Sequence, residues 1–482
     1  MKNFFFILTG FIVFIDKSRG IIYNNYVNNY QIHFMEIPAM AFFRMPGVKV
    51  PHRKHTSNSI PSRITPPEEV CLLLSMHIGA PAIPAVKPGD KVKIGQLVAK
   101  EGGYVSSPVH ASVSGTVKRI DDITTAANTL SKAIVIQSDG LMEKYELLTP
   151  PQVTDRPSFI QAVKESGVVG LGGAAFPTAV KLNVKEGVTV EEIIINGAEC
   201  EPYITADTRT FIDRADELLY GVDLLLKYIQ PKRIIIGIEN NKKEAIQKAK
   251  KLFESVKDVA VRELPSVYPQ GGEKVLIYST TKKIVPEGKL PLDVGVIVLN
   301  VTTVAAIARY IRTGMPLTEK CITVDGSAVN APANLIVPIG TRIKDVFAAA
   351  GGFKADPEKI IMGGPMMGHS MPDTEYPVMK GTNALLAFDK KDAEIPEETP
   401  CINCGSCIQR CPLHLDPPAF GKAYMLKDPK ALEKLKVNLC MECGVCSYVC
   451  PAKRHLVQRN RLAKNMLKEH NEKKKAEENK NG

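Results

Sequence analysis

The chain has 482 residues, 44% of them apolar, and a formal net charge of +11. A chain of this length and composition is expected to form roughly two to four domains, each with an apolar core. Its eleven cysteines are an odd number in a long chain, which argues against a secreted disulfide scaffold and favours a reducing cytoplasm.

Residues 1–45 begin with a twelve-residue apolar run, Phe4–Ile15. A bilayer span needs about twenty residues, and no small-residue cleavage site follows as it would in a signal peptide. We therefore expect an N-terminal extension outside the fold, upstream of a natural start at Met35, Met40 or Met45. No other apolar run has the length of a membrane span, so any work at a membrane is expected to be peripheral.

Short β segments and turns are expected between Ala80 and Gln137. The stretch Val86–Ile120, with "KPGDKVKIGQLV" and "SGTV", resembles the biotinyl/lipoyl barrel-sandwich family. Carrier domains of that family have a modifiable lysine at a hairpin tip, where this chain has Gly102–Ser106 and no lysine. The resemblance implies a barrel-sandwich domain over residues 46–150 without the swinging-arm function.

Strand-like and helix-like segments alternate in residues 151–315. The expected strands are Glu191–Ile195, Arg233–Ile238, Val259–Leu264 and Gly295–Asn300, and the expected helices are Ser158–Ser166, Asp213–Ile229 and Asn241–Val256. This alternation predicts a Rossmann-like α/β domain with a mainly parallel sheet.

Residues 316–388 return to β character, with two expected strands, a helix and glycine turns. This region resembles the β-grasp ligand-binding module found beside flavin domains. The glycine cluster Met362–Gly368 is predicted to be a hairpin. Residues 389–400 are charged and contain proline, which indicates a linker.

Residues 401–465 contain two copies of C-x2-C-x2-C-x3-C-P, the spacing of bacterial ferredoxins with two [4Fe–4S] clusters. In that arrangement the fourth cysteine of each run reaches the other cluster. The predicted ligand sets are Cys401, Cys404, Cys407 and Cys450 for one cluster, and Cys440, Cys443, Cys446 and Cys411 for the other.

Structural zinc is the alternative for paired C-x2-C motifs, but zinc sites close with four ligands in two pairs. The repeated three-plus-one rhythm with a following proline favours iron–sulfur clusters. Cys71, Cys200 and Cys321 are expected to be buried thiols.

The last 32 residues, 451–482, are basic: they hold ten Lys/Arg and four Asp/Glu, a net charge of +6. Residues 466–482 are predicted to form a basic tail after the cysteine-containing domain. Such a tail binds nucleic acid, anionic lipid or an acidic partner, or serves as a solubilising, partly helical tail. No nucleic-acid recognition motif accompanies it, so no nucleic-acid partner is predicted.

Four polar segments follow predicted strands or precede predicted helices in the α/β region. They are "GLGGAAFPTAVK" (Gly170–Lys181), "NGAECEPYITADTR" (Asn196–Arg209), "YPQGGEK" (Tyr268–Lys274) and "NVTT" (Asn300–Thr303). In open α/β sheets ligands bind at the carboxyl ends of the strands. The glycine loop fits neither G-x-G-x-x-G nor the P-loop pattern. Taken singly, each segment is equally compatible with an ordinary turn.

Together, these segments resemble the FMN- and NADH-binding subunit shared by respiratory complex I and its relatives, and more closely the C subunit of Rnf electron-transport complexes. The resemblance covers about residues 46–465. It places FMN around Gly170, Gly172, Gly173, Lys181, Asn196, Glu199, Gly271, Gly272, Asn300 and Thr303. It places NADH near Phe176, Glu201, Tyr268 and Glu273, with Lys181 shared.

The chain departs from complex I relatives at two positions: Leu171 replaces an arginine, and Ala175 stands where glycine is usual. The charge of that arginine on the flavin phosphate is therefore absent or supplied elsewhere.

The resemblance implies a peripheral subunit at the cytoplasmic face of the cell membrane, in an Rnf-type complex that couples ferredoxin:NAD⁺ oxidoreduction to Na⁺ or H⁺ translocation. Its partners would be the other subunits and, indirectly, ferredoxin. Two alternatives stay open at the sequence level: a related cobalamin reductase, and a non-enzymatic iron–sulfur scaffold. Lys181, Glu199, Glu201 and Glu273 argue against the scaffold.

Overall fold

A computed structural model describes residues 5–8, 11–16, 21–26, 46–124 and 130–481. The chain divides into two compact units, Met1–Pro46 and Gly47–Gly482. In the first unit, β1 (Phe5–Leu8), β2 (Phe11–Asp16) and β3 (Ile21–Tyr26) form an antiparallel sheet. The three candidate start methionines lie outside the described residues. All further elements belong to the second unit.

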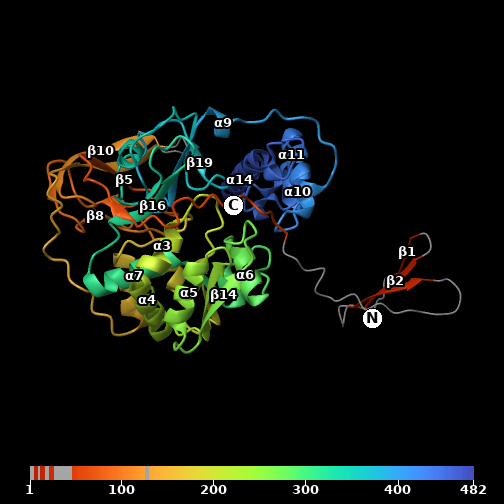
Figure 1. Ribbon diagram of the computed structural model, residues 1–482, viewed down its shortest axis with the longest axis horizontal. Coiled ribbons are helices and arrows are strands. Elements are labelled where there is room, and N and C mark those ends of the chain that lie inside the picture. The colour runs from red at the N-terminus through yellow and green to blue at the C-terminus, as the bar shows by residue number, and fades with distance from the viewer. Residues whose placement is uncertain (1–4, 9–10, 17–20, 27–45, 125–129, 482) are drawn as a thin grey trace. The chain divides into compact units, whose positions relative to one another are not determined.

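The α/β region contains a four-stranded, all-parallel sheet in the order β14-β13-β12-β15. The strands are β12 (Glu192–Gly197), β13 (Arg233–Glu239), β14 (Val259–Leu264) and β15 (Val296–Asn300). The helices are α1 (Arg156–Glu165), α2 (Thr178–Leu182), α3 (Ala206–Asp213), α4 (Ala215–Tyr228), α5 (Lys243–Phe253), α6 (Glu273–Thr281) and α7 (Val301–Thr313) (Figure 1). The predicted parallel α/β fold is confirmed. The helix predicted over 213–229 begins at Ala215, because Arg214 leaves helical geometry between α3 and α4.

Both faces of this sheet are buried, which explains why its strands are continuous apolar runs. Alternate residues of β12 face opposite sides: Ile193 and Ile195 join the main core, whereas Ile194 packs with Leu276 and Ile277 of α6. Side chains alternate along a strand, so one apolar run serves two cores.

The barrel-sandwich region consists of two small sheets. One has the order β5-β11-β10-β7 and the other β6-β8-β9. The strands are β5 (Glu69–Leu73), β6 (Ile83–Pro84), β7 (Lys91–Val92), β8 (Leu97–Lys100), β9 (Val109–His110), β10 (Gly115–Thr124) and β11 (Leu130–Ser138). In the loop where carriers have a lysine, the Gly102 amide donates to Ser106 Oγ at 3.0 Å, so hydrogen bonds close the loop.

The β-grasp region forms a six-stranded sheet in the order β19-β18-β20-β16-β17-β4. Its elements are β4 (Ser62–Arg63), β16 (Glu319–Asp325), β17 (Ala333–Pro338), α8 (Ile343–Ala349), β18 (Lys359–Met362), β19 (His369–Met371) and β20 (Ala384–Phe388). Antiparallel pairing of Met362 with His369 makes Gly363–Gly368 the loop of a hairpin, which confirms that prediction. A short helix, α9 (Lys390–Ala393), follows.

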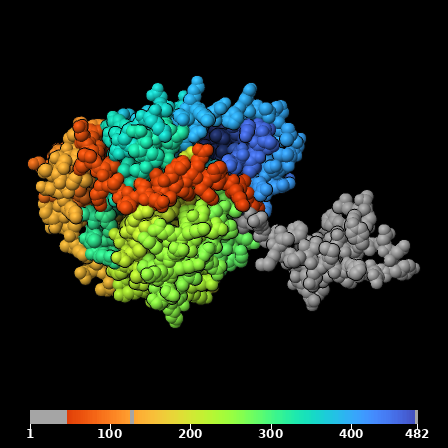
Figure 2. Space-filling model, in the orientation of Figure 1, coloured from red at the N-terminus to blue at the C-terminus, as the bar shows by residue number. Residues whose placement is uncertain are grey.

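Residues 47–63, predicted as part of the barrel-sandwich domain, instead pair with the α/β region and the β-grasp region. Val48 pairs with Tyr268 of the α/β region through two backbone hydrogen bonds of 2.8 and 2.9 Å. β4 pairs in parallel with β17 of the β-grasp sheet. Figure 2 shows this segment as a red strip between the green α/β region and the cyan β-grasp region. It therefore ties the two regions together.

Glu319 anchors the end of this strip, since its carboxylate binds Arg63 and lies 2.7 Å from Arg309 Nη1 of α7. Burial alone raises the pKa of Glu319, but the hydrogen bonds and charges of Arg63 and Arg309 lower it to about 2. A carboxylate whose pKa is lower in the folded than in the unfolded protein stabilises the fold at pH values above its unfolded-state pKa. That stabilisation is lost as the pH falls toward the folded-state pKa.

We expect Glu319→Gln to lower the free energy of unfolding at pH 7 by about 2 to 3 kcal/mol. Urea unfolding at a series of pH values should show this difference shrinking as pH falls from about 5 to about 3. Glu397→Gln, at an exposed position, serves as the control. A difference that stays constant with pH would contradict the assigned role of the ion pair.

The C-terminal region is helical, with α10 (Ser406–Gln409), α11 (Pro417–Met425), α12 (Pro429–Lys434), α13 (Val445–Tyr448) and α14 (Leu456–Asn481). α14 continues into the basic tail without a break. The two cysteine motifs repeat in backbone conformation: left-handed residues recur 39 positions apart at Asn403 and Glu442, Gly405 and Gly444, and His414 and Lys453. Over the described parts of the chain, no helix combines the length and apolar character needed to cross a bilayer.

Candidate functional site

The candidate site lies at the carboxyl edge of the parallel sheet, where β12 and β15 are neighbours. From β12 the chain proceeds to β13 and β14 on one side, and β15 lies on the other. This reversal of strand order is a topological switch point, the position at which open α/β sheets bind ligands. The residues that the glycine loop and the segments after β12 and β15 contribute there are called the crevice. The segments after β12 and β15 both contribute residues predicted to bind a cofactor.

The glycine loop Gly170–Ala175 lies against the start of α7. The Leu171 amide donates to Thr303 Oγ1 at 2.9 Å, and the loop closes on itself through a 3.0 Å bond from the Ala175 amide to Gly170 O. Gly172 and Gly173 are exposed. A Cβ at Gly172 would lie 2.9 Å from Asn300 Nδ2, so a side chain there would displace the Asn300 amide.

Ala175 has a φ of +51°, in the left-handed region that favours glycine. The alanine therefore holds a strained backbone at the loop, as functional sites often do.

Asn300 is the centre of a partly buried polar network behind this loop. Its Oδ1 accepts the Thr303 amide at 3.2 Å, which caps α7, and its Nδ2 donates to Asp207 at 2.7 Å. Thr302 Oγ1 donates to the other Asp207 oxygen at 2.6 Å. Burial and the neighbouring Glu199 charge raise the pKa of Asp207. The network therefore fixes Asn300 beneath Gly172.

Glu199 turns its carboxylate onto the first turn of α3. It accepts hydrogen bonds from the Asp207 amide at 2.6 Å and from the Thr208 amide and hydroxyl at 3.2 and 2.6 Å. Lys54 and Lys242 donate to its backbone carbonyl at 2.9 and 3.4 Å. The Glu199 side chain thus holds α3, and its backbone, at a φ of +43°, borders the crevice.

Two further predicted residues lie at the opposite side of the crevice. Lys181 Nζ lies 2.9 Å from Glu273 Oε1 and 3.0 Å from Val298 O, which joins α2 to α6 and β15. Asn196 Nδ2 donates to Gly271 O at 3.0 Å. The end of β12 and the loop before α6 are therefore joined.

Glu201 and Tyr268 lie deeper, at the boundary with the β-grasp hairpin. The amides of Met366 and Met367 donate to the Glu201 carboxylate at 3.0 and 2.9 Å. Burial raises the pKa of Glu201 to about 7 despite these bonds. The Tyr268 hydroxyl donates to Cys443 O at 2.8 Å and lies 3.5 Å from Glu201. The predicted nicotinamide contacts therefore adjoin the second cysteine motif.

The residues of the crevice fit a flavin nucleotide. The exposed glycines leave a cradle that a side chain at position 172 would disturb, and exposed loop amides suit an anionic phosphate. Phe176, partly exposed at the end of the loop, supplies an apolar face. The loop, Asn300 and Thr303 would hold such a group.

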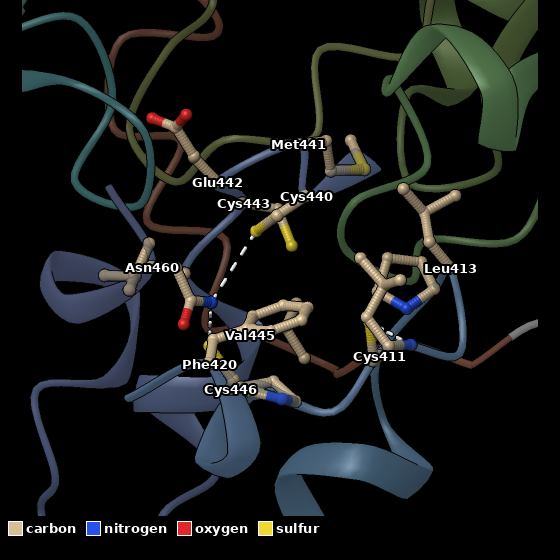
Figure 3. A pocket seen from close by; sticks show the side chains of 15 residues that line it. Cys411, Leu413, Phe420, Cys440, Met441, Glu442, Cys443, Val445, Cys446 and Asn460 are labelled. Atoms are coloured by element: carbon tan, nitrogen blue, oxygen red, sulfur yellow. Dashed lines mark hydrogen bonds between the residues drawn. The ribbon is translucent and has the colours of Figure 1, made fainter. Parts of the chain in front are cut away.

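The second cysteine motif and Cys411 surround one cavity (Figure 3). Its walls include Cys411, Cys440, Cys443 and Cys446, with Phe420 and Val445 between them. This is one of the two predicted ligand sets, brought together by chain crossing. Burial raises the pKa of Cys443 and of Cys446 to about 12, and cations bound in the cavity would favour their thiolate forms.

Four cysteines line this cavity, although within the described ranges no group of three or more His, Cys, Asp or Glu side chains is placed to hold a metal ion. Thiolates around a cavity fit the separated irons of a cubane. Asn460 of α14, 1% exposed, donates toward Cys440 Sγ at 3.6 Å and Cys446 Sγ at 3.9 Å.

The first cysteine motif is more accessible to solvent. Cys401 and Cys404 are exposed, whereas Cys407 and Cys450 pack partly buried beside Leu456 and Val457.

The two motifs also match in their amide–sulfur hydrogen bonds. Leu415 N donates to Cys411 Sγ at 3.3 Å, and Arg454 N donates to Cys450 Sγ at 3.5 Å.

The second motif packs directly on the loop before α6. A Cβ on Gly272 would lie 2.4 Å from Met441 Cε, and one on Gly444 would lie 3.0 Å from Met366 O. Tyr268, Cys443 and Val445 share one small core. The crevice and the second cysteine site are therefore neighbours.

Several participating residues had not been predicted. Asp207 lies within the predicted segment Asn196–Arg209, but the sequence did not indicate that its carboxylate binds Asn300 and Thr302. Asn460 and Met441 carry no motif signal, because their roles come from packing between distant segments. Lys320 of β16, which donates to Leu171 O at 2.6 Å, is of the same kind.

A crevice suited to a flavin nucleotide, with one cysteine site packed beside it and a second, more exposed cysteine site in the C-terminal region, defines an iron–sulfur flavoprotein of the electron-transfer class. Family models agree along the chain: residues 43–141 match the RnfC barrel sandwich hybrid domain, 163–309 the Nuo51 FMN-binding domain, 321–369 the SLBB domain, and 400–455 the 4Fe-4S dicluster domain. The chain belongs to the RnfC family, the C subunits of the ion-translocating ferredoxin:NAD⁺ oxidoreductase, or Rnf, complexes.

Two curated relatives establish this membership. The C subunit of the proton-translocating ferredoxin:NAD(+) oxidoreductase complex of Clostridium ljungdahlii is 42% identical over 76% of this chain and 80% of its own length. Its counterpart in the Na(+)-translocating complex of Acetobacterium woodii is 41% identical over 77% of this chain and 85% of its own length. An NAD⁺-reducing [NiFe]-hydrogenase chain is 19% identical, with a TM-score of 0.48, over 65% of this chain and 63% of that chain.

Proposed function

We propose that this chain is the NAD(H)-reactive, peripheral subunit of a membrane-bound ferredoxin:NAD⁺ oxidoreductase complex that moves Na⁺ or H⁺. Its cofactors are FMN, NAD(H) and two [4Fe–4S] clusters. The observation that carries the proposal is the direct packing of the second cysteine motif on the loop before α6, through Met441 and Gly272.

The cofactors supply the redox chemistry: a flavin exchanges a hydride with a nicotinamide and single electrons with iron–sulfur clusters. The protein supplies binding and orientation. The glycine loop and Asn300 hold the flavin nucleotide, and the cysteines hold the clusters. Among the described residues, no nucleophile or acid–base pair is needed for this chemistry.

The exposure of the two cysteine sites suggests an order for electron transfer. Cys443 and Cys446 are buried beside the crevice, whereas Cys401 and Cys404 are exposed. We therefore assign the second motif to exchange with the flavin site, and the first motif to exchange with a partner subunit. The proposed location is the cytoplasmic face of the membrane, with ferredoxin acting through the other subunits.

The function is tested with protein purified anaerobically and reconstituted with FMN. NADH is expected to bleach the flavin absorbance and to support reduction of an artificial acceptor only when FMN is present. A flavin that NADH never bleaches would overturn the proposal.

Glu201 gives a more specific prediction. We expect Glu201→Gln to raise the KM for NADH by roughly tenfold, the loss of one charged hydrogen bond, while the Kd for FMN changes by less than about twofold. Steady-state kinetics and FMN titration measure the two effects. Glu263→Gln is the control, since Glu263 pairs with Lys250 at an exposed site on β14. A larger effect on FMN than on NADH would reverse the assignment.

A further inference from the structure

Lys320 is a buried cation whose role the proposed function leaves open. The residue is 4% exposed, and its Nζ donates to Leu171 O at 2.6 Å and to Lys380 O at 3.1 Å. In the described portions of the chain, no carboxylate forms an ion pair with it. The carboxylate whose charge acts on it, Asp207, has both oxygens bound by Asn300 and Thr302. A nearby anion would stabilise a buried ammonium that is held only by carbonyls.

Lys320 lies directly behind the glycine loop. The outer side of that loop presents Gly172, Gly173 and Ala174, all exposed. The amides of these three residues donate to no other described residue, whereas the amides of Leu171 and Ala175 are bound within the protein. Successive free amides form a concave site that attracts anions.

Leu171 itself brings no charge to the loop. Its side chain is 2% exposed and belongs to the main core. Lys320 reaches the Leu171 carbonyl from β16, so a positive charge comes to this position from a different region of the chain.

We propose that Lys320 supplies the positive charge that favours the phosphate of FMN at the glycine loop, acting through the loop as a positioning residue. This inference rests on the proposed function, because it assumes that FMN occupies the crevice. It assigns the β-grasp region a part in flavin binding. Burial lowers the pKa of Lys320 and the Asp207 charge raises it; a bound phosphate would raise it further and hold the ammonium charged.

The test compares FMN with riboflavin, which lacks the phosphate, on the full-length chain after removal of bound flavin. Flavin fluorescence titration gives both dissociation constants. Lys320→Gln keeps an amide donor for the Leu171 carbonyl but removes the charge. We expect its Kd for FMN to rise by roughly tenfold, and its Kd for riboflavin to change by less than about twofold.

Two variants serve as controls. Lys320→Arg keeps the charge and is expected to retain the preference for FMN over riboflavin. Lys380 is a matched buried lysine, 1% exposed, but its Nζ points to Ser107, Pro108 and Gly167. Lys380→Gln is therefore expected to leave the FMN-to-riboflavin ratio unchanged.

Equal losses for both flavins in Lys320→Gln, or no loss for either, would overturn the role of Lys320. If Lys320→Gln unfolds, Lys320→Met, which keeps the apolar stem, replaces it in the same comparison. Failure of the unchanged protein to bind either flavin would instead contradict the proposed function, so the two failures are distinguishable.

Discussion

Cys443→Ala is expected to lower the iron content from about eight to about four atoms per chain. Cys443 is 8% exposed and lines the cavity beside the crevice. Because the cavity is buried, solvent does not readily replace the missing ligand, and the cluster is lost. NADH should still bleach the flavin, because the glycine loop is untouched. The remaining cluster should no longer be reduced by NADH, as electron paramagnetic resonance would show.

Cys404→Ala provides the matched comparison. It also removes one cluster and should leave about four iron atoms, but Cys404 is exposed, whereas it is the second motif that packs on the loop before α6. NADH should therefore still reduce the remaining cluster. Cys321→Ala, at a cysteine outside both motifs, should retain about eight iron atoms. Two zinc ions in the unchanged protein would refute the cluster assignment, and reduction in Cys443→Ala but not in Cys404→Ala would reverse the proposed order.

Gly172→Ala is expected to weaken FMN binding between about tenfold and a hundredfold. The added Cβ would lie 2.9 Å from Asn300 Nδ2, and Asn300 cannot move without losing its 2.7 Å bond to Asp207. Asn300 is one of the residues expected to contact FMN, so displacing it removes a hydrogen bond to the flavin nucleotide. A hydrogen bond to a charged group contributes about 1.5 to 3 kcal/mol, which corresponds to that range.

Fluorescence titration of the deflavinated protein measures this effect, and thermal unfolding checks that the fold persists. Gly103→Ala is the control, because a Cβ there would meet only Ala80 Cβ at 3.3 Å. Unchanged FMN affinity in Gly172→Ala would show that the flavin does not use this cradle.

Local patterns in the sequence were sufficient for much of the fold. The apolar runs of β12 and β13 are buried on both faces, so their composition alone indicates a parallel sheet. The two cysteine runs have a spacing fixed by the geometry of the clusters they bind, and even the left-handed residues of the motifs recur at the same interval. Such patterns can be recognised in a single sequence because they involve residues that are close together along the chain.

The site residues were identified only in part, because their partners are distant in sequence. Glu199 and Glu201 are alike in the sequence, yet one caps α3 and the other binds the hairpin at Met366 and Met367. The strip formed by residues 47–63 had no periodicity to indicate that it pairs with Tyr268 and with β17. Packing, not composition, assigned these roles.

The sequence by itself predicted the order of the domains, the two cysteine ligand sets and the segments proposed to bind the flavin, because each depends on short-range spacing. Only the tertiary structure decided which cysteine site adjoins the crevice and which charge lies behind the glycine loop. Met441 meets Gly272, and Lys320 meets Leu171, across separations of 169 and 149 residues. Contacts over such separations depend on how whole domains pack, and a local pattern does not record that packing.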